Sequence, residues 1–343
     1  MKALTLLAIA LIVAIPTHAQ DDLDGNNAPQ GPRVILRHVA DSIYMFEGKG
    51  GNVGIFVGGE GGLMIDSQFP DATSKLMKGY EGMSSSSLKY LINTHHHGDH
   101  TGGNANFKAM GITIISHNNV RTRLIEEALS AANAERDKEF ESRINTLRES
   151  GNENSAADLT AKDELRDRPE IELKDVFPSL TIRDKTTIHL NGEEIELIPL
   201  NPGHTNGDIL VWFKNSNVIH TGDAYVKGRY PYIDTKSGGA VDGYFAGLKR
   251  IMNLINDDTK IIPGHGAIAN MNDLKESHRM FESILEDVTF FAFSGKTLEE
   301  ILAMKEITKA YDDKGYGEGF ITTAAFVEAL YAEPAAKYKK AKK

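Results

Sequence analysis

The chain has 343 residues, of which 48 are Asp or Glu and 38 are Lys or Arg, and it has no cysteine. This length suffices for one large domain or two ordinary ones with a core large enough to be stable. The formal net charge of −10 argues against a general nucleic-acid-binding protein, which needs a basic face. Without cysteine, disulfides, thiol catalysis and thiolate-bound metals are excluded, so any metal must be held by His, Asp or Glu.

The N-terminal segment has the pattern of a secretory signal peptide. Lys2 supplies a positive charge, residues 3–15 are apolar apart from one threonine, and Thr17-His18-Ala19 places small residues at the two positions that signal peptidase recognises. We expect residues 1–19 to be removed and the mature chain to be periplasmic or secreted, with no membrane segment left. The alternative is an uncleaved anchor, for which the apolar run is short. Residues 20–32 are polar and contain Gly and Pro, which predicts a linker.

Short apolar runs after the linker predict strands with a helix between them. Val57 and Leu63 flank the sequence Gly-Gly-Glu-Gly-Gly, which predicts a hairpin turn. A helix is expected over residues 70–80. Strands are expected over residues 42–46, 53–57, 63–65, 89–92 and 112–115.

The amino-acid composition of the sequence changes between about residues 118 and 178. Charges of both signs are dense there, and apolar residues such as Leu124, Leu129 and Ile144 recur at helical spacing. We expect a helical insertion, which is either a lid over a site or a solvated helical hairpin without a role in one.

A second series of strands follows the insertion, and then a long helical region. A helix is expected over residues 243–255, and the chain is helical from 272 to a lysine-rich end. We therefore expect one domain over residues 33–271 and a C-terminal helical extension over residues 272–343. The later strands are expected over residues 180–182, 187–190, 195–200, 209–213, 218–219 and 260–262.

The two halves of the domain repeat one order of elements. In the first, a strand ends at Asp66, a helix follows, and the next strand leads into the histidines that begin at His95. In the second, a strand ends at Asp223, a helix follows, and the next strand ends before His265. Two such β/α halves facing each other would bring these polar groups to one edge, where sites in α/β folds occur.

The segment Thr94-His95-His96-His97-Gly98-Asp99-His100 carries the strongest chemical signal. In an extended chain, His95 and His97 point the same way and can bind one ion, while His96 points away and is not expected to be a ligand. Asp99 and His100 follow the glycine turn and can serve a second ion. The alternative is a surface histidine cluster, which the buried strand before the segment and the glycines after it disfavour.

Three later residues complete a ligand set. His204 lies in the sequence Pro-Gly-His-Thr, Asp223 follows a strand in His-Thr-Gly-Asp, and His265 stands between two glycines. Each of these is a weak signal alone, because a single loop histidine is more often a surface or hydrogen-bonded residue. Together with the first segment they give five His and two Asp, enough for two metal ions.

With these motifs in order, the sequence resembles the metallo-β-lactamase superfamily over roughly residues 43–267. The resemblance implies an α/β fold, the αββα sandwich with a dinuclear metal edge, here with a helical insertion and a helical C-terminus. By that resemblance, the first ion would be held by His95, His97 and His204, the second by Asp99, His100 and His265, and both by a bridging Asp223.

The missing cysteine separates this chain from the cysteine-bearing resistance enzymes of that superfamily. Asp223 instead resembles the bridging aspartate of its glyoxalase II and lactonase branches, which puts antibiotic hydrolysis in doubt. The same fold also carries iron-dependent dioxygenases and flavodi-iron proteins, so the fold alone does not fix the chemistry.

Two dications would lower the pKa of a shared water, so that a bridging hydroxide is the nucleophile and Asp99 orients it. We expect an exported dinuclear zinc hydrolase, with iron or manganese as other possible metals, that cleaves a small cyclic amide or ester such as a β-lactam or lactone. The alternatives are a thioester hydrolase of glyoxalase II type, a mononuclear iron dioxygenase, and a binding protein without catalysis. The oligomeric state is left open.

Weaker candidates surround these ligands. Asp66, Thr94 and His220 are expected to fix the tautomers of the ligand imidazoles from outside. Tyr225, Tyr230 or Tyr232 would donate to an oxyanion, although packing on a loop is the simpler role for each. Lys227 or Arg229 would form an ion pair with a carboxylate of the substrate. The glycine-rich hairpin at residues 48–52, with Phe46 and Lys49, is expected to overhang the site.

Overall fold

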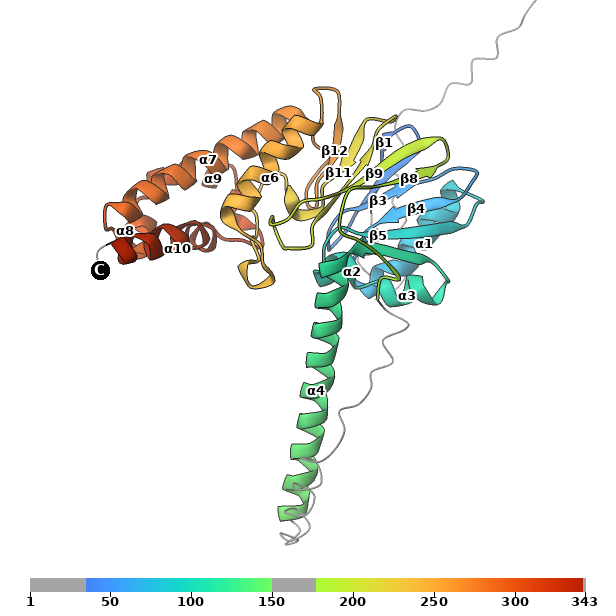
Figure 1. Cartoon of the computed structure of the whole chain (residues 1–343), viewed down its shortest axis with the longest axis horizontal. Coiled ribbons are helices and arrows are strands. Elements are labelled where there is room, and N and C mark those ends of the chain that lie inside the picture. Colours follow the sequence, from blue (N-terminus) through green and yellow to red (C-terminus); the bar gives the residue numbers. More distant parts are fainter. Residues whose placement is uncertain (1–34, 150–176, 342–343) are drawn as a thin grey trace, which may run out of the picture.

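The computed structural model describes residues 35–149 and 177–341, and it consists of two stacked sheets with helices on their outer faces (Figure 1). In the first sheet the strands lie side by side in sequence order. The pairs from β1 to β4 are antiparallel, and those from β4 to β7 are parallel. These strands are β1 (Ile35–Ala40), β2 (Ile43–Glu47), β3 (Val53–Phe56), β4 (Gly62–Ile65), β5 (Leu88–Asn93), β6 (Thr113–His117) and β7 (Leu180–Ile182).

The second sheet has the strand order β12-β11-β10-β9-β8. Its pairs are antiparallel except for β11 and β12, which run parallel. Parallel pairs, β4–β5 and β11–β12, therefore occur in both sheets, each with a helix between its two strands in the chain. These strands are β8 (Thr186–Leu190), β9 (Glu193–Pro199), β10 (Ile209–Phe213), β11 (Val218–His220) and β12 (Lys260–Ile262).

Apolar side chains from the inner faces of both sheets form the central core. Ile65 and Ile92 of the first sheet and Ile195, Val211 and Ile262 of the second belong to this cluster, and all are fully buried. Alternating side chains explain the arrangement, because every second residue of a strand points to the same face.

Helices cover both outer faces and complete the predicted αββα sandwich, which is confirmed. On the first sheet, α1 (Thr73–Met83) and α3 (Asn104–Ala109) bury Leu76, Tyr80 and Phe107 against the strands. The second sheet is covered by α6 (Val241–Leu254) and by α7 (Met271–Phe293), which begins with a capping box at Asn270.

The expected C-terminal extension is helical in the residues that the structure describes. Its helices α8 (Leu298–Ala303), α9 (Lys309–Asp312) and α10 (Thr323–Ala341) follow α7, and α10 packs along α7 (Figure 1). Leu274 of α7 and Leu330 of α10 share one cluster with Leu210 of the second sheet. The extension is therefore held on the sandwich by a common apolar core.

The first part of the predicted insertion is a single long helix, α4 (Asn118–Glu149), which runs away from the sheets in Figure 1. Its first turns stay close to the body, where Asn119 donates to the carbonyl oxygen of Asn206. The rest of the insertion, the linker and the signal segment lie outside the described residues. Within the described ranges no helix combines the length and apolar character needed to cross a membrane.

Candidate metal centre

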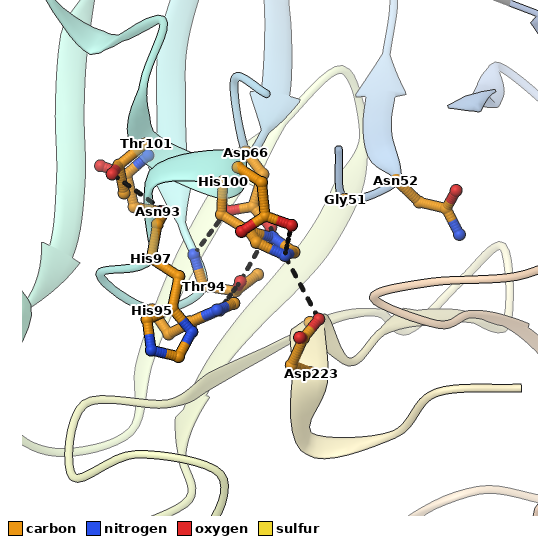
Figure 2. Close-up of polar contacts among 12 residues, drawn as sticks. Gly51, Asn52, Asp66, Asn93, Thr94, His95, His97, His100, Thr101 and Asp223 are labelled. Carbon is orange, nitrogen blue, oxygen red and sulfur yellow. Dashed lines mark hydrogen bonds and ion pairs between the residues drawn. The ribbon is translucent and has the colours of Figure 1, made fainter. Parts of the chain in front are cut away.

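The predicted ligands gather at one edge of the sandwich, where strands of both sheets end. Figure 2 shows His95, His97, His100 and Asp223 among them. The histidine segment follows β5 with bends at residues 94–96, and the short helix α2 (Gly98–Thr101) then turns the chain so that His100 faces back toward His95. The ring centroids of these two histidines lie 4.1 Å apart. The structure thus brings together side chains that the sequence places on either side of a glycine turn.

In two of the histidines, a buried partner holds the outer ring nitrogen, which is the one that points away from the other predicted ligands. Nδ1 of His95 lies 3.0 Å from Oγ1 of Thr94, and Nδ1 of His100 lies 2.8 Å from Oδ2 of Asp66. The Thr94 hydroxyl donates its own hydrogen to Oδ2 of Asp66. Its oxygen therefore accepts a hydrogen bond from the Nδ1–H of His95. Nε2 of His95 is buried without a hydrogen-bond partner among the described residues, and Nε2 of His100 is buried with only the carboxylates of Asp223 and Asp99 near it. Such orphaned lone pairs are what a metal ion satisfies.

His204 and His97 also each have one ring nitrogen held by a protein partner. Nδ1 of His204 donates to the carbonyl oxygen of Tyr232 at 2.7 Å, and Nε2 of His97 lies 3.0 Å from Oδ2 of Asp234. These partners assign the protons to the outer nitrogens. The inner nitrogens, Nε2 of His204 and Nδ1 of His97, then face each other at 2.9 Å with no proton between them. A shared cation would satisfy both lone pairs.

The Asp223 carboxylate stands between the two halves of the ligand set. Its Oδ1 lies 3.2 Å from Nε2 of His100, and its Oδ2 lies 3.8 Å from Nε2 of His204 and 3.5 Å from Nε2 of His265. Figure 2 shows the carboxylate directed toward His100. The position of Asp223 between ligands of both predicted ions suits a bridging carboxylate.

Asp99 faces the second half of the set. Its Oδ2 lies 3.3 Å from Nε2 of His265 and 3.6 Å from Nε2 of His100. The ligand atoms of the described residues form compact groups within 4.8 Å, which are His95-His97-His204, His95-His100-Asp223, Asp99-His100-His265 and His96-His97-Asp234. The first and third of these groups are the two ligand triplets that the resemblance implied.

Burial and mutual charge set the protonation of these groups. Burial lowers the pKa of His95 well below its usual range and that of His204 to about 4, which keeps both imidazoles neutral, as metal ligands must be. Burial also opposes charge on His100, but Asp223 and Asp66 outweigh it and raise the pKa of His100. Burial would raise the pKa of Asp223, but His265 and His100 outweigh it and hold that pKa well below its usual range.

Imidazole and carboxylate donors of this kind suit zinc, iron or manganese. A family model described as the metallo-beta-lactamase superfamily matches residues 47–265. The chain belongs to the metallo-beta-lactamase superfamily. It therefore combines a hydrolase-like fold with His and Asp groups that are able to bind metal.

Solved structures of metallo-beta-lactamases share the fold at low identity. DIM-1 metallo-beta-lactamase is 15% identical, with a TM-score of 0.53 over 74% of this chain and 99% of its own. TMB-1 is 15% identical and VMB-1 is 16% identical, each with a TM-score of 0.51 over 73% of this chain and 97% of its own. No curated protein matches the chain in sequence.

A side-chain hydrogen-bond pair and one tight backbone contact fix the loops that carry His265 and Asp223. The Asn52 amide donates to the carbonyl oxygens of Pro263 and Gly266, which fixes the loop that carries His265. A side chain on Gly264 would collide with Oδ1 of Asp223, so only glycine fits at that position. His220 contacts Asn52 and the backbone of the Asp223 loop rather than a ligand imidazole.

A cavity of about 470 Å³ opens directly over the metal edge. This size is in the range of small-molecule sites. Lys49, Phe69, Arg229, Tyr232 and Phe320 are among its walls. With them it is lined by His97, Gly98, Asp99, Asp223, Val226, Tyr230, His265 and Ile321.

Two of the weaker sequence candidates lie away from this cavity. Tyr225 is fully buried in the core against the C-terminal helices, and Nζ of Lys227 pairs with Asp273 at 2.8 Å. Arg229 and Tyr232, which the sequence offered as alternatives, line the cavity instead. The loop contains several bends between residues 225 and 229, so the sequence could not show which of its side chains face the predicted ligands.

His96 points away from the two predicted ions. Its Nε2 lies 3.5 Å from Oε1 of Glu127 on α4 and 4.0 Å from Oδ2 of Asp234. Burial lowers the pKa of His96 to about 3, so the ring is neutral. Asp234, which holds His97, was not singled out by the sequence, because no motif marks it.

Proposed function

We propose that this chain is an exported hydrolase that uses two zinc ions to cleave a cyclic amide or ester, such as a β-lactam or lactone, of a small-molecule substrate. The observation that carries the proposal is the way in which four of the ligand imidazoles are held. In His95, His97, His100 and His204, one nitrogen contacts a neighbouring protein group, and the other faces a common centre that contains Asp223. Membership of the superfamily and the names of the structural neighbours favour the same chemistry.

His95, His97 and His204 would hold one ion, Asp99, His100 and His265 the other, and Asp223 both. When bound, two divalent cations would activate a water molecule for attack and polarise the scissile carbonyl group.

Asp99 is placed to steer the proton of the attacking water. Its side chain is 27% exposed and lines the cavity, so it can accept a hydrogen bond from a water molecule there while contacting His265. The Lys49 ammonium and the Arg229 guanidinium also line the cavity, and neither pairs with a carboxylate among the described residues. They would bind an anionic group of the substrate and orient its carbonyl carbon toward the metal edge.

The test is a metal count combined with a substrate panel. Zinc-loaded mature protein is assayed against β-lactams, lactones, thioesters and phosphoesters, and its metal content is measured by plasma mass spectrometry. Two zinc ions per chain and turnover of a lactam or lactone are expected. A single bound iron with oxygen-dependent turnover, or turnover confined to thioesters, would overturn the proposal in favour of a dioxygenase or a glyoxalase II type enzyme.

Export has its own test. The full-length chain is expressed in a Gram-negative host, and the N-terminus of the periplasmic product is determined by mass spectrometry. A mature chain that begins at Gln20 is expected. Recovery of an uncleaved chain from the cytosol or the membrane would contradict export of a soluble product.

A further inference from the structure

The C-terminal extension reaches over the metal edge with an exposed aromatic ring. Phe320 lies between α9 and α10, its side chain is 84% exposed, and it lines the same cavity as His97 and His265. Isolated exposed apolar residues are common on protein surfaces and need no role. This one differs because it stands at the mouth of a cavity lined by predicted metal ligands.

The segment that carries Phe320 is anchored on both sides. Before it, Tyr316 is buried against Tyr230 with ring centroids 5.6 Å apart. After it, Thr323 donates to Oδ1 of Asp312 at 2.6 Å, and the Tyr230 hydroxyl donates to the same oxygen at 3.0 Å. Phe320 is therefore held out toward solvent by a fixed backbone.

A row of rings connects Phe320 with the ligands of the first ion. Its ring lies 5.9 Å from that of Tyr232, edge to face, and the Tyr232 ring lies 5.8 Å from those of His97 and His204. Phe69 and Ile321 line the same cavity. An apolar wall of the cavity thus runs from the predicted metal ligands to the extension.

We propose that Phe320 and Tyr232 form a subsite for an extended apolar substituent, an alkyl chain or an aryl ring, on the carbonyl group of the substrate. The inference rests on the proposed hydrolytic function and names the substrate class that it selects. Covering Phe320 with such a group removes apolar surface from water, and each added methylene gains binding free energy until the wall ends. Phe320 is a specificity-determining residue in this view, and it takes no part in bond cleavage.

The test compares substrates with one leaving group and different acyl chains. For zinc-loaded protein, kcat/KM is measured with the p-nitrophenyl esters of acetate, butyrate, hexanoate and octanoate. The wild-type ratio of octanoate to acetate is expected to exceed one and to fall about tenfold in Phe320→Ala. Phe320→Leu, which keeps an apolar group, is expected to retain most of the ratio.

Phe290→Ala is the matched control, because that phenylalanine is 66% exposed on α7 and does not line the cavity. It is expected to leave the ratio unchanged. An unchanged ratio in Phe320→Ala, or an equal fall in the control, would overturn the subsite.

A binding measurement separates this inference from the proposed function. Calorimetric titration of zinc-loaded protein with acetate and octanoate is expected to show tighter binding of octanoate, and Phe320→Ala is expected to abolish the difference. If this holds while no ester, lactone or lactam is hydrolysed, the subsite stands and the proposed function fails. If esters are hydrolysed but octanoate has no advantage, the subsite fails and the function stands.

Discussion

Oδ2 of Asp66 lies 2.8 Å from Nδ1 of His100, and both side chains are completely buried. The same carboxylate accepts hydrogen bonds from the backbone and the hydroxyl of Thr94, which in turn holds Nδ1 of His95. One carboxylate that touches no predicted metal position therefore orients a ligand of each ion. Partners of this kind fix the tautomer and raise the basicity of the ligand nitrogen.

Replacement of Asp66 by Asn should weaken metal binding about tenfold to a hundredfold without unfolding the protein. The amide has nearly the same size, and Asn tolerates the left-handed backbone at this position, where φ is 66°. Its NH₂ group, however, would face the Nδ1–H of His100, so that two donors oppose each other. Competition with a zinc chelator measures the effect.

The control for that experiment is Asp41→Asn, which changes an exposed aspartate that also has a positive φ, of 44°. It should leave zinc affinity unchanged. Equal zinc affinity in the Asp66 variant and the wild type would show that the carboxylate stabilises the loop and does not tune the metal ligands.

Replacement of Asp99 by Ala should lower kcat by at least about a hundredfold on any substrate that the panel identifies. The variant lacks the carboxylate that would accept the proton of the attacking water. It also lacks one of the three predicted ligands of the second ion, which are Asp99, His100 and His265. We expect reduced metal content on that side only, because the other triplet, His95-His97-His204, does not contain Asp99. Asp71→Ala, which changes an exposed aspartate in the 3-10 helix Pro70–Ala72, is the control. Normal turnover by the Asp99 variant would contradict the proposed mechanism.

The predicted ligands were accessible from the sequence because each follows a strand or a glycine turn in a short motif. Periodicity likewise located nearly all of the strands, since buried strands such as β10 are runs of apolar residues. Strand β1 was not expected, because it is an edge strand whose side chains are all half-buried or exposed and show no clean alternation.

Contacts between distant segments were beyond the reach of the sequence. Asp234 is 137 residues from His97, and nothing in its Tyr-rich surroundings marks it as a partner of an imidazole. Phe320 likewise lies in a segment without a motif, and contacts between distant residues, such as that of Tyr316 with Tyr230, bring it to the cavity. Such pairings depend on the tertiary fold and not on local propensity.

Replacement of Asp312 by Ala should destabilise the protein by about 2–4 kcal/mol. Its carboxylate accepts hydrogen bonds from the hydroxyl groups of Tyr230, Thr308 and Thr323, which would lose their partner. The neighbouring Asp313 offers a matched control, since it is exposed and pairs with Lys309 one helical turn away. Asp313→Ala should cost less than about 0.5 kcal/mol. Urea unfolding compares the two, and similar losses would show that Asp312 does not anchor the extension.

The last prediction concerns His117, where β6 meets α4. Its Nδ1 accepts a hydrogen bond from the backbone N–H of Asn119, and its Nε2 lies 3.1 Å from Nδ2 of Asn201. Burial, with a contribution from Arg183, lowers the pKa of His117 in the folded protein. The unfolded chain has a His pKa of about 6.5 and therefore binds more protons in acid than the folded one.

The stability that this neutral imidazole contributes is consequently complete above pH of about 6.5 and is lost as the pH falls toward the lower folded pKa. His117→Asn should reduce the fall in Tm of metal-free protein between about pH 7.5 and about pH 5.5. His189→Asn, which changes an exposed imidazole on β8, controls for the loss of a histidine elsewhere. The interpretation would be wrong if the His117 variant lost as much Tm over this interval as the wild type, because the acid sensitivity would then arise from other buried groups.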